Sequence, residues 1–248
     1  RLISPPGRVV SGEIVFDGVP LHQNTEAEMA EIRGRDVAMI FQQPQNSLNP
    51  VHTTGNQVAE VYTLHSDISQ DDARAKAVGM FQMVGIPDSA QKINAYPHEM
   101  SGGQAQRVMI AMGLSQSPKL LIADEPTTAL DVTIQAQILN LMRDLKEKLN
   151  TAVILITHDL GVVAEMADRV AVMYAGQIVE QAETETLFRK PLHPYTQGLI
   201  ASIPIMGQLK ERLSVIPGTV PNLVNAPKGC LFAPRCQGFN PPTPRSTA

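Results

Sequence analysis

The 248-residue sequence has no tryptophan, only two cysteines and just 4% aromatic residues. So few aromatic rings argue against a surface on which single-stranded bases stack. A net charge of −4 argues against a broad basic face for duplex DNA or anionic lipid, so we expect no nucleic-acid partner. Two cysteines cannot build a disulfide framework, which is consistent with a reducing compartment.

Long apolar runs are also missing. No stretch approaches the roughly 18 apolar residues that span a bilayer, and no secretory signal peptide is recognisable. Hydrophobic residues nevertheless make up 43% of the chain, which is enough to bury a sizeable core. The chain opens at Arg1 without an initiating methionine, and we expect it to be the middle of something longer.

Strand and helix patterns alternate along much of the chain. Apolar segments at residues 36–41, 119–123 and 152–157 predict buried strands. Residues 132–149 give the clearest helical pattern, with Asp131 as its N-cap. Alternating apolar strands and helices predict an α/β fold with a parallel sheet.

Other segments predict smaller elements. Residues 9–18 and 170–180 alternate apolar and polar positions around turn residues, which predicts two antiparallel hairpins. The helical block between residues 41 and 119 is too long for one crossover, so we expect an inserted helical subdomain. After about residue 190 the chain is rich in proline and predicted to be irregular.

Two adjacent carboxylates, Asp124 and Glu125, end the apolar segment at 119–123. The carboxyl end of a parallel strand faces the ligand crevice of such folds. One acid can hold Mg²⁺ while its neighbour orients or deprotonates a water molecule. A solvated acidic turn is the alternative interpretation of an isolated pair.

A Ser-Gly-Gly sequence, residues 101–103, precedes an apolar-periodic helix. Backbone N–H groups at such a helix start can hold a phosphate, although an ordinary Ser/Gly N-cap is the alternative. His158 follows the segment at 152–157 and Gln42 follows the segment at 36–41. His158 could bond a terminal phosphate and Gln42 could reach an ion or water, but neither residue is informative alone.

Taken in order and spacing, these motifs resemble those of the ATP-binding cassette (ABC) ATPases over about residues 10–190. The resemblance implies a P-loop-type ABC ATPase domain with a mostly parallel core sheet, a helical subdomain at about 45–102 and small antiparallel β elements. Five motifs carry it: Gln42 (Q-loop), residues 100–104 (signature motif, with Met100 where Leu is more usual), residues 120–125 (Walker B strand), residues 129–131 (D-loop) and His158 (switch histidine).

The resemblance also implies a role for each site residue. Asp124 and Gln42 would hold Mg²⁺, Glu125 would be the general base, and His158 would contact the γ-phosphate. Catalysis would thus depend on Glu125, His158 and Gln42. Ser101, Gly102 and Gly103 would bind the γ-phosphate of an ATP held by the opposite subunit, and Gln104 and Asp131 complete the nucleotide-binding set.

The phosphate loop of this family, G-x-x-x-x-G-K-[ST], does not occur in the 248 residues. Residues 1–190 are therefore expected to match an ABC ATPase domain that lacks its first strand and phosphate loop, and the chain as given is expected to be inactive alone. A truncated sequence is one interpretation, and a naturally loop-less regulatory subunit is the other.

Residues 41–50 and 191–199 resemble the oligopeptide/dipeptide importer branch, and 229–236 resemble the C-terminal extension of that branch, here residues 191–248. Further cysteines follow in the branch, and some members are thought to hold an iron–sulfur cluster. Cys230 and Cys236 are the only thiols here, and two thiolates cannot complete a four-cysteine cluster, so we expect free thiols.

The resemblance thus implies an ATP-binding and ATP-hydrolysing subunit of a di/oligopeptide importer, with ATP and Mg²⁺ as cofactors. It would lie on the cytoplasmic face of the membrane with transmembrane permease subunits and a second ABC ATPase subunit, served indirectly by an extracytoplasmic peptide-binding protein. A soluble ABC ATPase of DNA repair or translation and a non-catalytic ABC subunit are the alternatives. The substrate (dipeptide, oligopeptide, glutathione-like peptide or nickel) and the choice of homodimer or heterodimer stay open.

Overall fold

The computed structural model describes residues 6–128, 130–203, 215–236 and 238. It forms two compact units, Arg1–Ile156 and Thr157–Ala248. Within the described ranges, no helix combines the length and the apolar character needed to cross a membrane.

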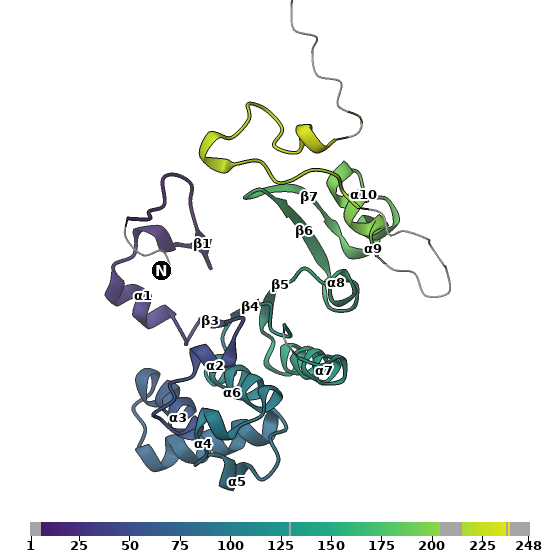
Figure 1. Ribbon diagram of the computed structural model, residues 1–248. Helices are drawn as coiled ribbons and strands as arrows, with labels where there is room; N and C mark the ends of the chain where they lie inside the picture. The colour runs from purple at the N-terminus through teal and green to yellow at the C-terminus, as the bar shows by residue number, and fades with distance from the viewer. Residues whose placement is uncertain (1–5, 129, 204–214, 237, 239–248) are drawn as a thin grey trace, which may run out of the picture. The chain divides into compact units, whose positions relative to one another are not determined.

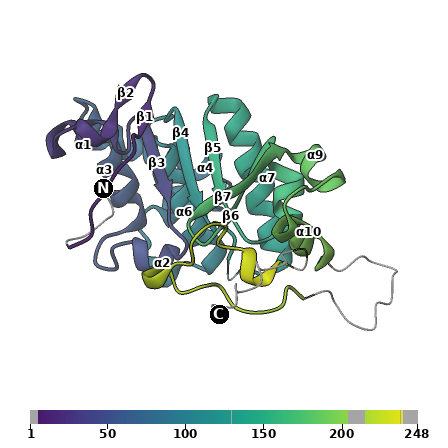
Figure 2. The ribbon, with the colours of Figure 1, turned by 90° about the horizontal axis from the view of Figure 1, so that it is seen from above.

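A three-stranded parallel sheet organises the first unit, in the order β3 (Val37–Ile40), β4 (Leu120–Asp124), β5 (Ala152–Ile156). Figure 2 shows the three strands side by side. Asp124 pairs with Ile156 at the carboxyl ends of β4 and β5. The three predicted strands and their parallel arrangement are confirmed, and the segments that follow them leave from one edge of the sheet. The prediction that all three strands are buried is wrong for β5, which has no buried residue and leaves Ile154 and Ile156 50% and 46% exposed.

Helix α6 (Gly102–Leu114) packs against β3 and the buried face of the sheet. The face is apolar because alternate residues point to it: Ala38, Ile40, Leu121 and Ala123. A Cβ at Gly113 would lie 3.3 Å from Leu121 Cδ1 and 3.5 Å from Ile40 Cγ1. The glycine therefore lets the helix backbone approach the sheet closely.

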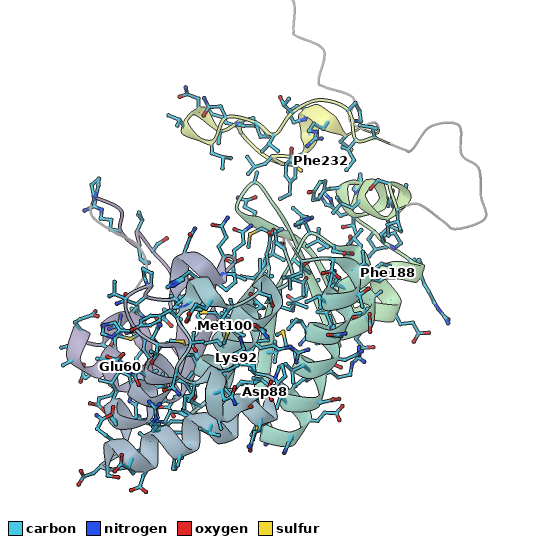
Figure 3. The ribbon with its side chains drawn as sticks, turned by 60° about the horizontal axis from the view of Figure 1, so that its bottom comes forward. Glu60, Asp88, Lys92, Met100, Phe188 and Phe232 are labelled. Atoms are coloured by element: carbon cyan, nitrogen blue, oxygen red, sulfur yellow. The ribbon has the colours of Figure 1, made fainter. Side chains whose placement is uncertain are left out.

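Between β3 and α6 the chain forms the expected helical subdomain, shown in Figure 1 as a group of helices around α6. It contains α2 (Pro44–Ser47), α3 (Thr54–His65), α4 (Gln70–Met83) and α5 (Ser89–Lys92), and ends at a 3₁₀ turn, η2 (Pro97–Glu99). Figure 3 labels Lys92 on α5 and the buried Met100, which follows η2.

One side of α4 is buried and apolar. Ala73, Ala77, Met80 and Phe81 are all buried. Ser69 caps the helix by accepting the N–H of Asp72 at 3.1 Å. The Asp72 carboxylate in turn accepts the Ser69 hydroxyl at 2.7 Å.

One buried amide ties α3 to the segment that precedes it. Gln57 is 6% exposed. Its Oε1 accepts the N–H of Asn49 at 2.8 Å, and its Nε2 donates to the carbonyls of Asn49 (3.0 Å) and His52 (3.1 Å). Gln57 thereby satisfies three backbone groups of residues 49–52, which have no regular ladder of their own.

Helix α7 (Val132–Leu149) has the predicted bounds. Asp131 caps it by accepting the N–H of Ile134 at 3.0 Å. The helix forms because one apolar stripe is buried while its other positions are polar. That stripe includes Ile138, Leu139, Met142 and Leu145.

The hairpin expected at residues 9–18 is much shorter than predicted. Strands β1 (Val15–Phe16) and β2 (Val19–Pro20) contain two residues each, and residues 9–14 form no strand. The turn is as predicted, since Asp17 (φ 50°) and Gly18 (φ 79°) have left-handed backbone. The alternation of apolar and polar residues does not produce a longer strand here, because the apolar side chains of the segment stay exposed.

A 3₁₀ turn, η1 (Leu21–Gln23), and a capped helix, α1 (Glu26–Ile32), complete the N-terminal part.

The second unit begins with α8 (Leu160–Met166) and contains an antiparallel hairpin of β6 (Arg169–Tyr174) and β7 (Gln177–Glu183). The hairpin was predicted, and its turn lies at Ala175 (φ 49°) and Gly176 (φ 80°). Helix α9 (Thr184–Arg189) follows.

The prediction that the chain is irregular beyond residue 190 is wrong at α10 (Pro194–Ala201). Proline is tolerated in the first turn of a helix, where its missing N–H has no intrahelical partner anyway. His193 caps the helix by accepting the N–H of Tyr195 on its Nδ1 at 3.1 Å. Two 3₁₀ turns, η3 (Leu223–Asn225) and η4 (Ala233–Arg235), are the only regular elements described after it.

A carboxylate on β7 binds the backbone of the two residues that precede α10. Glu180 accepts the backbone N–H groups of Leu192 (2.7 Å) and His193 (2.9 Å). Burial by itself would raise the pKa of the Glu180 carboxyl, but the nearby Thr196 hydroxyl and the backbone N–H groups of Leu192 and His193 outweigh it and lower that pKa.

The segment 215–236 is anchored by an aromatic cluster. Phe232, labelled in Figure 3, is 3% exposed and its ring lies 5.2 Å from that of Tyr174 and 5.6 Å from that of Tyr195. Arg235 donates to the carbonyls of Pro217 (2.8 Å) and Ile216 (3.1 Å). Cys230, which is exposed, and Cys236, which is partly exposed, form no disulfide.

Candidate functional site

Polar side chains meet at the carboxyl edge of the sheet in the first unit. Asp124 is the last residue of β4, Glu125 follows it, and Gln42 lies two residues beyond β3. Gln42 Nε2 donates to Glu125 Oε2 at 2.7 Å. The parallel register therefore brings two residues that were singled out from the sequence into direct contact.

The backbone of Glu125 is left-handed, with φ of 44°. This costs about 1–3 kcal/mol for a residue with a side chain, and the following Pro126 favours extended backbone instead. Two hydrogen bonds hold the conformation: the N–H of Glu125 donates to the Ile156 carbonyl at 2.9 Å, and its carbonyl accepts the Thr128 N–H at 3.1 Å. Strain of this kind concentrates at functional sites.

A second side chain contacts the same carboxylate oxygen. Thr128 Oγ1 donates to Glu125 Oε2 at 2.9 Å. We did not predict this contact. The available signal was a hydroxyl three residues after the carboxylate, a spacing at which a tight turn can return a side chain to its first residue.

A hollow of about 450 Å³ forms where α6 and α7 begin. Residues from both helix starts and from the turn before α7 line it. All the residues that we assigned to nucleotide binding are among them, together with Leu130 of the D-loop motif and two residues that were not predicted. The lining consists of Ser101, Gly102, Gly103, Gln104 and Asp131, with Arg107, Leu130 and Ile134.

The start of α6 has the geometry of both an ordinary N-cap and a phosphate-binding turn, the two interpretations given for its sequence. Ser101 and Gln104 form a capping box: the N–H of Gln104 donates to Ser101 Oγ at 3.3 Å, and Gln104 Oε1 accepts the N–H of Ser101 at 3.2 Å. The N–H groups of Gly102 and Gly103 lie in the first turn, at the positive end of the helix dipole. The same turn is thus an ordinary N-cap and a surface that favours an anion.

The two glycines of this turn differ in the space beside them. A Cβ on Gly103 would lie 2.8 Å from Ile134 Cγ2, which is closer than real Cβ contacts. A Cβ on Gly102 would lie 3.8 Å from Leu130 Cδ2, an ordinary van der Waals distance. Gly103 is therefore where the backbone of α6 meets the side chains of α7.

Arg107 connects the hollow to the helical subdomain. Its guanidinium donates from Nη1 to the Val84 carbonyl and from Nη2 to Gln137 Oε1, the latter at 3.3 Å. Burial lowers the pKa of Arg107 from its usual value. One side chain of α6 thus fixes both the end of α4 and the first half of α7.

The oxygen donors at the sheet edge suit magnesium. Asp124 offers a carboxylate and Gln42 an amide carbonyl, and Mg²⁺ typically takes one or two carboxylates while water and phosphate complete its shell. Among the described residues there is no group of three or more His, Cys, Asp or Glu that could hold a metal alone. The donor set therefore fits an ion that arrives with a phosphate ligand.

His158 belongs to the second unit, two residues after β5 ends. Asp159 next to it caps α8 by accepting the N–H of Gly161 at 2.8 Å. The assigned roles of His158 and of the other site residues stay predictions, and residue 129 of the D-loop lies outside the described residues.

Known proteins resemble this chain along nearly its whole length. Residues 1–128 match the ABC transporter family, and residues 179–240 match the oligopeptide/dipeptide transporter C-terminal region. The oligopeptide transport ATP-binding protein AppD of Bacillus subtilis (strain 168) is 54% identical over 233 residues, which are 94% of this chain and 71% of AppD. The dipeptide transport ATP-binding protein DppD of Escherichia coli (strain K12) is 50% identical over 95% of this chain and 72% of its own length.

Solved structures agree with the fold. The ATP-binding cassette MJ0796, in a dimeric post-hydrolysis state bound to ADP and Pi, aligns with a TM-score of 0.64 at 27% identity, covering 71% of this chain and 74% of that one. The predicted α/β cassette fold is confirmed. The chain therefore belongs to the ABC transporter family of ATP-binding proteins, in the branch that carries the oligopeptide/dipeptide transporter C-terminal region.

Proposed function

We propose that this chain is the ATP-binding and ATP-hydrolysing subunit of an importer that carries di- or oligopeptides across the cytoplasmic membrane. The observation that carries the proposal is the combination, in one chain, of the ABC transporter match and the oligopeptide/dipeptide C-terminal region. Relatives at 54% and 50% identity are named for oligopeptide and dipeptide transport. The same C-terminal region argues against a soluble ABC ATPase of DNA repair or translation.

In this proposal Glu125 accepts a proton from the water that attacks the γ-phosphate. Its carboxylate is oriented by Gln42 and Thr128, at 2.7 Å and 2.9 Å, so little reorganisation precedes the reaction. Asp124 and the Gln42 carbonyl would hold Mg²⁺, which when bound neutralises charge on the phosphates. His158 would donate a hydrogen bond to the γ-phosphate.

The hollow at the start of α6 would receive the γ-phosphate of an ATP held by a second ABC ATPase subunit. Support comes from the Ser101 hydroxyl and the glycine N–H groups of this turn, which are typical anion donors. A related cassette is dimeric in its solved structure. ATP bound between two such subunits would then make hydrolysis dependent on their association.

The remaining partners follow from the same family position. The subunit would dock on transmembrane permease subunits at the cytoplasmic face of the membrane, and a peptide-binding protein outside would deliver the substrate to the permease. Transport would couple to ATP hydrolysis through closure and reopening of the ATPase pair.

Glu125→Gln tests the catalytic assignment in the assembled transporter, with the phosphate loop that residues 1–248 lack restored upstream of this chain. It should lower ATP turnover on the order of 10²–10⁴-fold, because a positioned general base is lost, while ATP binding is retained. Glu147→Gln, on an exposed position of α7, is the matched control and should turn over normally.

Near-normal turnover by the Glu125→Gln variant would show that the base lies elsewhere. Vesicles that contain the transporter provide the second measurement. ATP-dependent uptake of a labelled di- or oligopeptide is expected, and ATP hydrolysis that no peptide stimulates would refute the assignment as a peptide importer.

A further inference from the structure

We propose that Thr128 is a positioning residue for hydrolysis, whose hydroxyl holds the Glu125 carboxylate in its working orientation; this inference rests on the proposed function. The contact that motivates it is the 2.9 Å bond from Thr128 Oγ1 to Glu125 Oε2. The Gln42 amide contacts the same oxygen at 2.7 Å. Two donors on one oxygen fix the direction in which the carboxylate points.

The two donors reach Glu125 from different parts of the fold. Gln42 lies beyond β3 and arrives from a separate segment of the chain. Thr128 belongs to the same turn as Glu125, because its N–H donates to the Glu125 carbonyl at 3.1 Å. Thr128 therefore moves together with the carboxylate, whereas Gln42 keeps its bond only while two segments stay in register.

The distinction matters because Gln42 has a second task in the proposed mechanism. If its side chain turns toward Mg²⁺ and phosphate, its bond to Glu125 lengthens or breaks. A free glutamate side chain has three rotatable bonds, and its attack geometry would then be lost. Thr128 keeps one donor on Oε2 throughout, so the base stays oriented as the metal site fills.

The strained backbone of Glu125 makes the hydrogen bond from Thr128 more effective in orienting the carboxylate. A left-handed residue at the end of a strand directs its side chain away from the usual strand positions. The main-chain bonds to Ile156 and Thr128 fix where the side chain starts. The Thr128 hydroxyl fixes where it ends, so one turn defines both ends of the catalytic side chain.

The test compares Thr128→Val, which removes the hydroxyl at nearly constant shape, with Thr128→Ser, which keeps it. In the assembled transporter, Thr128→Val should lower kcat about 10-fold, the effect of losing one hydrogen bond to a charged group, with KM for ATP nearly unchanged. Thr128→Ser should recover most of the rate. Thr63→Val is the control, because the Thr63 hydroxyl bonds the Glu60 carbonyl on a helix outside the site.

A second background separates positioning from structure. In a Glu125→Gln protein, Thr128→Val should cause no further loss, since Thr128 acts only through the carboxylate. Unchanged kcat in Thr128→Val would overturn the proposal, as would a Thr128→Ser variant as slow as Thr128→Val, or an equal further loss in the Glu125→Gln background. If Glu125→Gln itself turns over normally, the proposed function fails instead. Thr128 is exposed, so these variants are expected to fold, and Thr128→Ala offers a second hydroxyl-free variant.

Discussion

Substituting the two glycines of the α6 start separately should give opposite effects on stability. A Cβ on Gly102 has 3.8 Å of room, whereas a Cβ on Gly103 would lie 2.8 Å from Ile134 Cγ2. Both residues are in the first turn of the same helix, so alanine brings each of them a similar gain in helix propensity. The difference between the two variants therefore isolates the contact with α7.

The size of that difference can be worked out from the two contributions. Replacing glycine by alanine in a helix is worth about 0.5–1 kcal/mol. Overpacking a tight contact costs about 1–3 kcal/mol. Gly102→Ala should thus be neutral or stabilising, and Gly103→Ala should unfold about 1–3 kcal/mol more easily than Gly102→Ala.

Urea denaturation of the chain with each substitution measures the difference directly. Ile134→Ala removes the opposing Cγ2, so in that background the two alanine variants should differ much less. The reasoning is refuted if Gly103→Ala is as stable as Gly102→Ala, or if the difference between them survives removal of the Ile134 side chain.

Two further predictions concern the second unit. Glu180→Gln should destabilise it at neutral pH: the lowered Glu180 pKa means that the carboxylate stabilises the fold above the usual value of 4.5 and loses this effect as pH falls through the lower folded value, so urea denaturation should show the variant and the parent converging below pH 4.5. Convergence at higher pH instead would contradict the sign. Phe232→Ala should weaken attachment of the segment 215–236 by about 3 kcal/mol, seen as faster proteolysis there than in Phe188→Ala, and equal cleavage of both would show that the aromatic cluster does not anchor the segment.

The regular core was predictable because its patterns are strong. Parallel strands typically have short apolar runs, and such runs predicted β4 and β5 correctly, although β5 has no buried residue. Helix α7 combines an apolar stripe with an Asp131 cap, two independent signals for one element. Where a pattern had no burial to support it, as at residues 9–14, the prediction of a strand was wrong.

The site was predictable residue by residue but not as a network. Motif spacing singled out Gln42 and Glu125, yet their 2.7 Å contact depends on the register of β3 and β4. Thr128 and Arg107 escaped notice because their importance lies in what they contact. For Thr128 the only signal was its spacing of three residues from Glu125, whereas Arg107 is an ordinary helix residue in sequence, and only the fold places the Val84 carbonyl beside it.

The buried Gln57 amide has a mechanical consequence. Because its hydrogen bonds join α3 to the backbone of Asn49 and His52, a displacement of α3 is expected to move residues 49–52 as well. Those residues continue back through α2 to Gln42, whose amide grips Glu125. A displacement of the helical subdomain can therefore be transmitted to the Glu125 carboxylate along residues 42–52, without passing through the sheet. Gln57 and Gln42 make the hydrogen bonds at the two ends of this segment.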